Sequence, residues 1–461
     1  MHSLLRGGHV MTLDAAGDIE GGDVLIEGER IAAIGRKLAA PAGCEVIDAA
    51  GTIVMPGLVN AHIHTWQLGL RGIGSDWVSS RDYAKAIHAG MAKHYLAEDN
   101  YVANLLGALA QINGGVTTLF DWCHNLRDAE MADASIDGLE QSGIRAVFGH
   151  GTAKPPPAAG EKPHWEVPHP RAEIQRLRKG RLASDDAKLT LAMAILGPDD
   201  ATYEVTRENL RMAREFGIIS SAHTWGREGK RFVADGMWRL GKEGLLGPDH
   251  NVSHGNNFGD DELKMILDHG CSISATPLTE MLNNDQVALL GRVTRHGAMP
   301  SLGTDVDAYF NSSMLAVTRH AFQHQREIDN RELAAAGQWP SKTKHATTTR
   351  QALQWATLGG AKALRLERKI GSLAVGKQAD VAMIRCDGLT AFPSLPGGDP
   401  AHVVVNYAEQ ADVDTVLIAG KAVKRHGRLL FPEQKLRELR DRLSASRERI
   451  MKAAAYRYSP A

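Results

Sequence analysis

Residues Val54–His64 read V-M-P-G-L-V-N-A-H-I-H, an apolar run that ends in two histidines, His62 and His64. On a β-strand, residues two apart point to the same face, so both imidazoles leave the strand end in one direction. Neutral imidazole nitrogens are common metal ligands, and this pair could bind a single ion. The motif alone is weak in a chain with 20 histidines, so its meaning depends on ligands at the ends of other strands.

The composition is that of an ordinary globular protein, with 43% hydrophobic and 23% charged residues in 461. Because 53 basic and 54 acidic residues nearly cancel, we expect neither nucleic acid nor an acidic membrane as a partner. We recognise no signal peptide and no apolar run of about 18 residues that would span a membrane. The four cysteines are far apart and form no C-x-x-C pair, which favours reduced thiols in a cytoplasmic protein.

Both ends of the chain are rich in predicted strands. Residues 1–56 carry short apolar runs between glycine turns, and the same pattern returns in residues 369–431. Each end has too few strands to bury a core alone, so we expect one β-sandwich domain built from both. Residues 432–461 are predicted to form a C-terminal helix whose apolar stripe packs on the protein or on a second subunit.

The middle of the chain, residues 57–368, alternates short apolar strands with helical stretches, the pattern of βα units. Eight strand candidates predict a (β/α)8 TIM barrel of the α/β class. An open doubly wound sheet is the alternative, but the glycine-rich phosphate loop that it would need after an early strand is missing from the sequence. The candidates are Ile53–His64, Val116–Trp122, Ile144–Thr152, Leu189–Gly197, Ile218–Thr224, Val252–Gly255, Cys271–Pro277 and Pro300–Val306. The segment Lys154–Pro170 should be a long surface loop, either a lid or a decoration.

Residues with metal-binding side chains stand at the ends of three later strand candidates. His223 ends the fifth candidate, His254 the sixth and Asp305 the eighth. Because a TIM barrel carries its chemistry at the C-terminal ends of its strands, these residues are expected to converge with His62 and His64.

These motifs resemble those of metal-dependent amidohydrolases in the triazine hydrolase and cytosine deaminase branch. The first-strand motif ending in His64, Gly303-Thr304-Asp305 and the segment Gly371–Asp380 are all similar to signatures of that family. The resemblance implies one divalent metal, zinc first and iron or manganese as alternatives. Its ligands would be His62, His64, His223 and Asp305. It also implies two catalytic residues: Asp305 would move the proton of the attacking water, and His254 would lie beside the electrophilic carbon.

One position departs from that branch. Its deaminases and chlorohydrolases have a glutamate three residues after the fifth-strand histidine, and Gly226 stands there in this chain. Attack on an aromatic ring carbon requires the ring nitrogen to gain a proton, so the loss of this acid favours an amide, urea or carbamate bond. The alternative is deamination or dechlorination of a nitrogen heterocycle, with Glu280 as the substitute acid and Glu228 as a second candidate.

The sequence therefore predicts a hydrolase that cleaves a C–N bond of a small molecule with a water activated by the metal. The segments that begin at His64 (H-T-W-Q-L-G-L-R-G-I), Thr117 (T-T-L-F-D-W-C-H-N) and Pro300 (P-S-L-G-T-D-V) resemble those of a subgroup that lacks the glutamate, the molinate and phenylurea hydrolases. Side chains that follow barrel strands should bind substrate, although the tryptophans could instead pack internally; these are Trp66, Gln67, His124, Trp225 and Glu280. A metal-free structural or interaction homologue is the alternative of another class, and the intact ligand set argues against it. We also expect a homo-oligomer.

Overall fold

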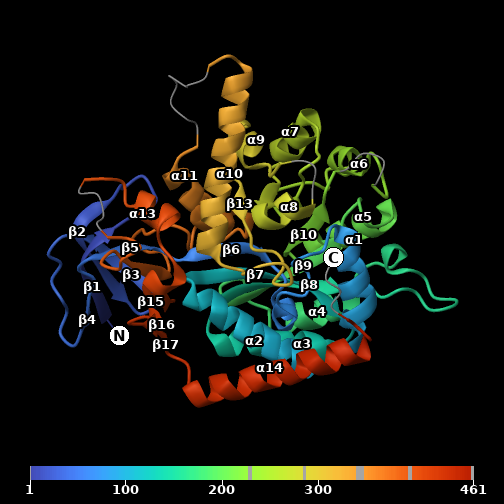
Figure 1. Cartoon of the computed structure of the whole chain (residues 1–461), viewed down its shortest axis with the longest axis horizontal. Helices are drawn as coiled ribbons and strands as arrows, with labels where there is room; N and C mark the ends of the chain where they lie inside the picture. Colours follow the sequence, from blue (N-terminus) through green and yellow to red (C-terminus); the bar gives the residue numbers. More distant parts are fainter. Residues whose placement is uncertain (1, 227–230, 284–286, 339–346, 393–396, 458–461) are drawn as a thin grey trace. The chain divides into compact units, whose positions relative to one another are not determined.

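The computed structural model describes residues 2–226, 231–283, 287–338, 347–392 and 397–457 (Figure 1). Two compact units are distinguished by their internal contacts. The first comprises Met1–Ala61, Ala110–Thr118 and Ser313–Leu430, and the second His62–Leu109, Leu119–Ser312 and Phe431–Ala461. The division into four segments expected from the sequence, 1–56, 57–368, 369–431 and 432–461, remains a prediction.

The first unit contains a nine-stranded sheet that draws on both ends of the chain. Its strands are β1 (His2–Val10), β2 (Ile19–Glu27), β3 (Arg30–Gly35), β4 (Glu45–Asp48), β5 (Thr52–Pro56), β14 (Val381–Arg385), β15 (Val413–Ile418), β16 (Lys421–Arg425) and β17 (Arg428–Leu429). The order is β17-β16-β15-β14-β5-β1-β2-β3, and β4 pairs with β1. The antiparallel pair β5–β14 joins the two halves, from Thr52 opposite Arg385 to Pro56 opposite Val381. One sheet from both ends is therefore confirmed.

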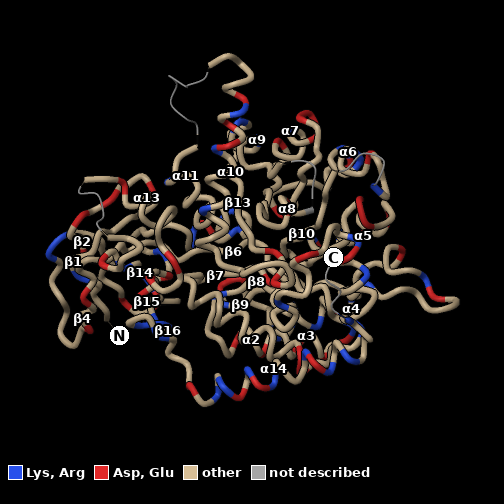
Figure 2. The backbone as a smooth tube through the Cα atoms, in the orientation of Figure 1, with Lys and Arg blue, Asp and Glu red and all other residues tan. Residues whose placement is uncertain are grey.

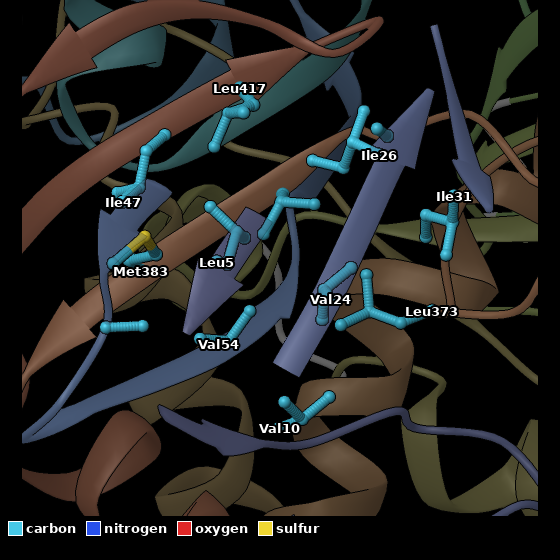
Figure 3. Packing of buried hydrophobic residues seen from close by; sticks show 13 residues of the cluster. Leu5, Val10, Val24, Ile26, Ile31, Ile47, Val54, Leu373, Met383 and Leu417 are labelled. Carbon is cyan, nitrogen blue, oxygen red and sulfur yellow. The ribbon is translucent and has the colours of Figure 1, made fainter. Parts of the chain in front are cut away.

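The core of this sheet also mixes the two ends. Leu5, Val24 and Val54 from the N-terminal strands pack in one buried cluster with Met383 and Leu417 from the C-terminal strands (Figure 3). Alternate residues of a strand point to the same face of the sheet, so a short strand such as β2 can place two apolar side chains, Val24 and Ile26, in this core.

The second sheet is the predicted barrel. It has eight strands, which neighbour one another in chain order, β6 through β13. An isolated parallel bridge between Ile63 and Asp305 connects the first strand to the segment after the last. The strands are β6 (Leu58–Ile63), β7 (Val116–Leu126), β8 (Arg145–Thr152), β9 (Leu189–Leu196), β10 (Ile219–Thr224), β11 (His250–His254), β12 (Ser272–Ala275) and β13 (Ser301–Leu302). The TIM-barrel class is thus confirmed.

The first predicted strand, Ile53–His64, is in fact two strands. Thr52–Pro56 belongs to the nine-stranded sheet and Leu58–Ile63 to the barrel, with Gly57 between them. A Cβ atom on Gly57 would lie 2.1 Å from Cγ2 of Thr117, so only a residue without a side chain lets the chain change sheets here.

Helices follow most barrel strands. They are α1 (Ser80–Tyr83), α2 (Ala97–Asn113), α3 (Ala129–Ser142), α4 (Arg171–Lys179), α5 (Tyr203–Glu215), α6 (Gly236–Lys242), α7 (Asp260–Asp268), α8 (Pro277–Asn283), α9 (Leu290–Arg295), α10 (Met314–Ala335), α11 (Thr349–Gln354), α12 (Gly360–Ala363), α13 (Ala401–Asn406) and α14 (Glu433–Ala453). None of the described helices is both long and apolar enough to cross a membrane.

The predicted C-terminal helix is α14. Leu439 and Ile450 on its apolar stripe are buried, and Leu443 packs against Gly69. The stripe therefore packs within the second unit, to which α14 belongs. Basic and acidic residues alternate along the rest of the helix (Figure 2), as expected for a solvated face.

Candidate active site

Four ligand-type side chains meet at the C-terminal ends of barrel strands. His62 lies on β6 and His64 just after it, His223 lies on β10, and Asp305 follows β13. Their ligand atoms all lie within 4.8 Å of one another. Nε2 of His62 is 3.2 Å from Nε2 of His223. Oδ1 of Asp305 is 3.4 Å from Nε2 of His62 and 3.2 Å from Nε2 of His64.

These separations fit one metal ion. With bonds of about 2.0–2.1 Å, two ligands of a tetrahedral ion stand about 3.3–3.4 Å apart, close to the three distances above. The other ring nitrogens are engaged: Nδ1 of His64 donates to the Trp122 carbonyl at 2.6 Å, and Nδ1 of His62 lies 3.0 Å from Oγ of Ser253. Such contacts orient metal-binding imidazoles and leave their Nε2 atoms for the ion.

Backbone hydrogen bonds to β6 hold Asp305 beside the histidines of this cluster. Its N–H donates to the His62 carbonyl at 2.9 Å, and the N–H of His64 donates to the Asp305 carbonyl at 3.0 Å. A Cβ atom on Gly303 would lie 2.6 Å from Cβ of His62, so a glycine is required for this approach. Asp305 itself has φ +62° and His254 has φ +75°. Left-handed backbone is uncommon outside glycine and concentrates at functional sites.

The protonation states suit metal binding. Burial lowers the pKa of His62 to about 4 and the pKa of His223 well below its ordinary value. Burial alone would raise the pKa of Asp305, but the interactions with the His62 and His64 rings outweigh it and hold that pKa well below its usual range. Two neutral imidazoles and a carboxylate at neutral pH are in the states that a metal ion requires of its ligands.

His254 ends β11 beside the four-ligand cluster. Its ring stacks on Trp225 with centroids 3.9 Å apart and an interplanar angle of 6°. Nδ1 of His254 lies 3.1 Å from Oγ1 of Thr276 and 3.3 Å from Oε1 of Glu280. The same Oε1 accepts the Thr276 N–H at 2.8 Å. Because a carboxylate accepts hydrogen bonds, this arrangement favours a proton on Nδ1 of His254.

A pocket of about 230 Å³ opens onto these groups. Six of the residues predicted for the site line it: His64, His124, His223, Trp225, His254 and Asp305. His62 is completely buried beneath them. The other predicted residues, Trp66, Gln67 and Glu280, are also buried and are absent from this lining.

Trp66, Gln67 and Glu280 each contact a residue of the lining. Nε1 of Trp66 donates to Nδ1 of His124 at 3.1 Å, and Nε2 of Gln67 donates to the Tyr83 hydroxyl at 2.5 Å. Glu280 contacts His254 as described above. The strand-end argument therefore located their neighbourhood but not the direction of their side chains. Glu228, the second candidate acid, lies outside the described residues.

The pocket also contains residues that the sequence interpretation did not select. Lys154 follows β8 and Asp200 lies after β9, so the rule that found the histidines could have found both. Tyr83 and His88 come from the irregular helical segment 80–91, and Tyr309 from the loop after β13, for which the sequence offers no comparable signal.

The position of the missing glutamate has no room for a side chain. Gly226 has φ +72°, and a Cβ atom there would lie 2.7 Å from Cδ1 of Phe258. A carboxylate nevertheless lies beside this backbone: Oδ2 of Asp199 accepts the N–H groups of Trp225 and Gly226, each at 2.8 Å. Burial raises the pKa of Asp199 to about 6.

Comparison with known proteins agrees with this geometry. Residues 53–423 match the Amidohydrolase family. The chain is 26% identical to a 5'-deoxyadenosine deaminase of Methanosarcina acetivorans, over 98% of this chain and 99% of the relative. It is 27% identical to a 5-methylthioadenosine/S-adenosylhomocysteine deaminase of Pyrococcus abyssi, over 94% and 96%.

Solved structures show the same fold. An adenosine deaminase from Xanthomonas campestris with bound zinc superposes with a TM-score of 0.78 at 21% identity, covering 98% of both chains. An atrazine chlorohydrolase from Arthrobacter aurescens complexed with zinc gives 0.81 at 21% identity, over 96% of this chain and 100% of the other. The family match covers most of the chain, and a cluster of potential metal ligands lies at the expected strand ends. This chain therefore belongs to the amidohydrolase family and is a hydrolase of carbon–nitrogen bonds other than peptide bonds.

Proposed function

We propose that the protein is a metal-dependent deaminase that replaces the amino group of a small nitrogen heterocycle with oxygen. The main observation behind this proposal is the position of His254. Its Nδ1 contacts Thr276 and Glu280. Its ring lines the same pocket as His64, His223 and Asp305. The deaminase relatives support it as well. These relatives favour deamination of a heterocycle, the alternative reaction in the sequence analysis, over hydrolysis of an amide-type bond. Both reactions belong to the class of C–N bond hydrolysis.

We infer that the ion is zinc and that His62, His64, His223 and Asp305 hold it. Three imidazoles and one carboxylate suit zinc, which would take water as a fifth ligand, and the two structural neighbours contain zinc. When bound, the ion acts as a Lewis acid and lowers the pKa of water to about 7.

The remaining steps fall to side chains of this chain. Asp305 accepts a proton from the attacking water while the new C–O bond forms. It then returns the proton to the amino group as the C–N bond breaks and ammonia leaves. His254 lies beside the reacting carbon and stabilises charge that develops in the tetrahedral intermediate. The stacked Trp225 fixes the ring plane of His254.

A ring nitrogen must also gain a proton during the attack, and Gly226 cannot supply it. We assign this role to the His254–Glu280 pair. Glu280 is absent from the pocket lining but contacts Nδ1 of His254. In its doubly protonated form, His254 donates its Nε2 proton to the ring nitrogen, while its Nδ1 proton stays hydrogen-bonded to Glu280, whose carboxylate stabilises the imidazolium. His254 regains a proton from the new hydroxyl group as the carbonyl forms, so the two protons of the attacking water end on the ring nitrogen and on ammonia. In this way Glu280 acts through His254.

Hydrolysis of an amide, urea or carbamate is the second candidate, and the closed position at Gly226 favours it because such a carbonyl needs no ring protonation. A substrate screen distinguishes the two functions. Metal-loaded protein is incubated with adenine nucleosides, aminopyrimidines and aminotriazines, and in parallel with amides, N-aryl ureas and thiocarbamates. Ammonia release from a heterocycle that disappears in Asp305→Asn supports the deaminase. Turnover confined to the second group contradicts it.

We also propose a cytoplasmic, homo-oligomeric protein with a small-molecule substrate. The four cysteines, all within the described part of the chain, are free, as expected in a reducing compartment. Cell fractionation tests the location. Light scattering after size exclusion tests the assembly, and a monomer mass at micromolar concentration would contradict it.

A further inference from the structure

The pocket is lined by a cation, Lys154, that has no hydrogen-bond or ion-pair partner among the described residues. Lys154 stands two residues beyond the end of β8, at the same rim of the barrel as the ligand cluster, and its side chain is only partly exposed. Its ammonium makes no hydrogen bond or ion pair with any residue that the structure describes. Partial burial of an unpaired ammonium costs free energy, and burial lowers the pKa of Lys154. Such a cost is typical of a group kept for binding.

The ammonium is close to the reacting end of the pocket. Nζ of Lys154 lies 5.7 Å from the centroid of the Trp122 ring. That ring is in turn 4.1 Å, centroid to centroid, from the imidazole of His223. Trp122 is fixed, because its Nε1 donates to Oγ of Ser221 at 3.2 Å. Lys154 is thus held above an aromatic surface next to a ligand of the cluster.

We propose that Lys154 binds an anionic oxygen group of the substrate, so that the protein acts on a small heterocyclic amine that also carries a carboxylate. The inference rests on the proposed deaminase function and adds the class of its substrate. A carboxylate at Lys154 forms a charge-assisted hydrogen bond and restores the pairing that the ammonium lacks. The ring of the same molecule extends through the pocket past His223 toward His254 and Asp305.

Asp200 determines which end of the pocket the anionic group of the substrate occupies. It lines the same pocket but forms no ion pair with Lys154 within 4.0 Å. Its carboxylate repels a second negative charge, so the anionic group is directed to Lys154 and a donor group of the substrate toward Asp200. Replacing Asp200 should therefore strengthen the binding of acids, while replacing Lys154 should weaken it.

Binding of matched acid and amide pairs tests this proposal without requiring turnover. Nicotinate is compared with nicotinamide, and adenosine-5'-carboxylate with its carboxamide, by calorimetry on the metal-loaded protein at fixed ionic strength. We expect the wild-type protein to prefer the acid of a pair by about tenfold to a hundredfold, as one charge-assisted hydrogen bond predicts. Lys154→Met should abolish the preference, Lys154→Arg should keep most of it, and Asp200→Asn should increase it. Lys162→Met, which removes an exposed lysine of the same loop, should leave it unchanged.

Two results would overturn the proposal. One is the absence of any acid preference in the wild-type protein. The other is a preference that persists in Lys154→Met, since the ion alone would then be holding the carboxylate. The proposed deaminase function fails separately: a Lys154-dependent acid preference with no ammonia released from any heterocycle would refute the reaction and keep the subsite. Ammonia release without acid preference would do the reverse.

Discussion

The strongest test of the site concerns Glu280, whose carboxylate contacts Nδ1 of His254. Glu280→Gln keeps the size of the side chain and removes its charge. Both residues are 1% exposed, so solvent screens the interaction little. A hydrogen bond to a charged group contributes about 1.5–3 kcal/mol. If that interaction is needed in the transition state, kcat should fall by about 10–150-fold.

The other kinetic parameters should change much less. Glu280 is absent from the lining, so KM should stay within about twofold, and metal content should remain that of the wild-type protein because Glu280 is no member of the ligand cluster. Steady-state ammonia release on the substrate found in the screen and metal analysis measure these quantities. Thr276→Val, which removes the other partner of Nδ1, provides a matched comparison without a charge change.

A double-mutant cycle decides whether Glu280 acts through His254. If it does, Glu280→Gln should cost almost nothing further in a His254→Ala background, because residues that act as a unit are not additive. Additive losses in kcat, or an effect confined to KM, would refute the reasoning and make Glu280 a separate acid or a substrate ligand.

Three further predictions concern the metal ligands, Asp199 and Gly226. His62→Ala should lower metal stoichiometry and activity together, and chelation should reduce the melting temperature of the wild-type protein, since an ion at 100 times its Kd adds about 2.7 kcal/mol to unfolding; unchanged metal content in the variant would contradict the ligand assignment. The folded protein keeps the Asp199 proton up to about pH 6, above the ordinary carboxyl pKa, so ionisation of Asp199 destabilises the fold as pH rises from about 4 to 6. Asp199→Asn should escape this loss, and denaturant titrations should show its stability relative to wild type increasing over that interval and then levelling; a pH-independent difference would argue against the raised pKa. Gly226→Ala should destabilise the protein by about 1–3 kcal/mol, because of its positive φ and the contact with Phe258, and an unchanged denaturation midpoint would show that the loop adapts.

Regular patterns made much of this protein predictable. The β-strand period places His62 and His64 on one face, and the strand-end rule for barrels brings His223 and Asp305 to them. These arguments need only local sequence and a repeated architecture, so they succeeded without knowledge of packing. The C-terminal helix followed for the same reason, from its apolar spacing.

The remaining features depend on contacts between distant segments. The apolar pattern of the sequence continues through Gly57, although β5 ends just before it and β6 begins just after it. The strands separate there because Thr117 lies against Gly57 and because β5 pairs with β14, more than 300 residues later in the chain. Trp66 and Gln67 follow a strand as expected, but their polar atoms turn to His124 and Tyr83 because buried donors require acceptors. Lys154 was assigned only to a surface loop after its strand, because local sequence does not show that this loop begins at the pocket.

The pairing of β5 with β14 also has a consequence for biosynthesis. Pro56 leaves the ribosome 325 residues before its partner Val381, which at about 5–20 residues per second is a delay of roughly 15–65 s. Throughout that time the edge of β5 and the apolar side chains beneath it, Val54 among them, lack their C-terminal cover. An unpaired, hydrophobic strand edge is a template for aggregation. The nascent chain should therefore depend on chaperones that shield its first 60 residues, and slowing translation should lower the yield of soluble protein more than a point mutation in the pocket does.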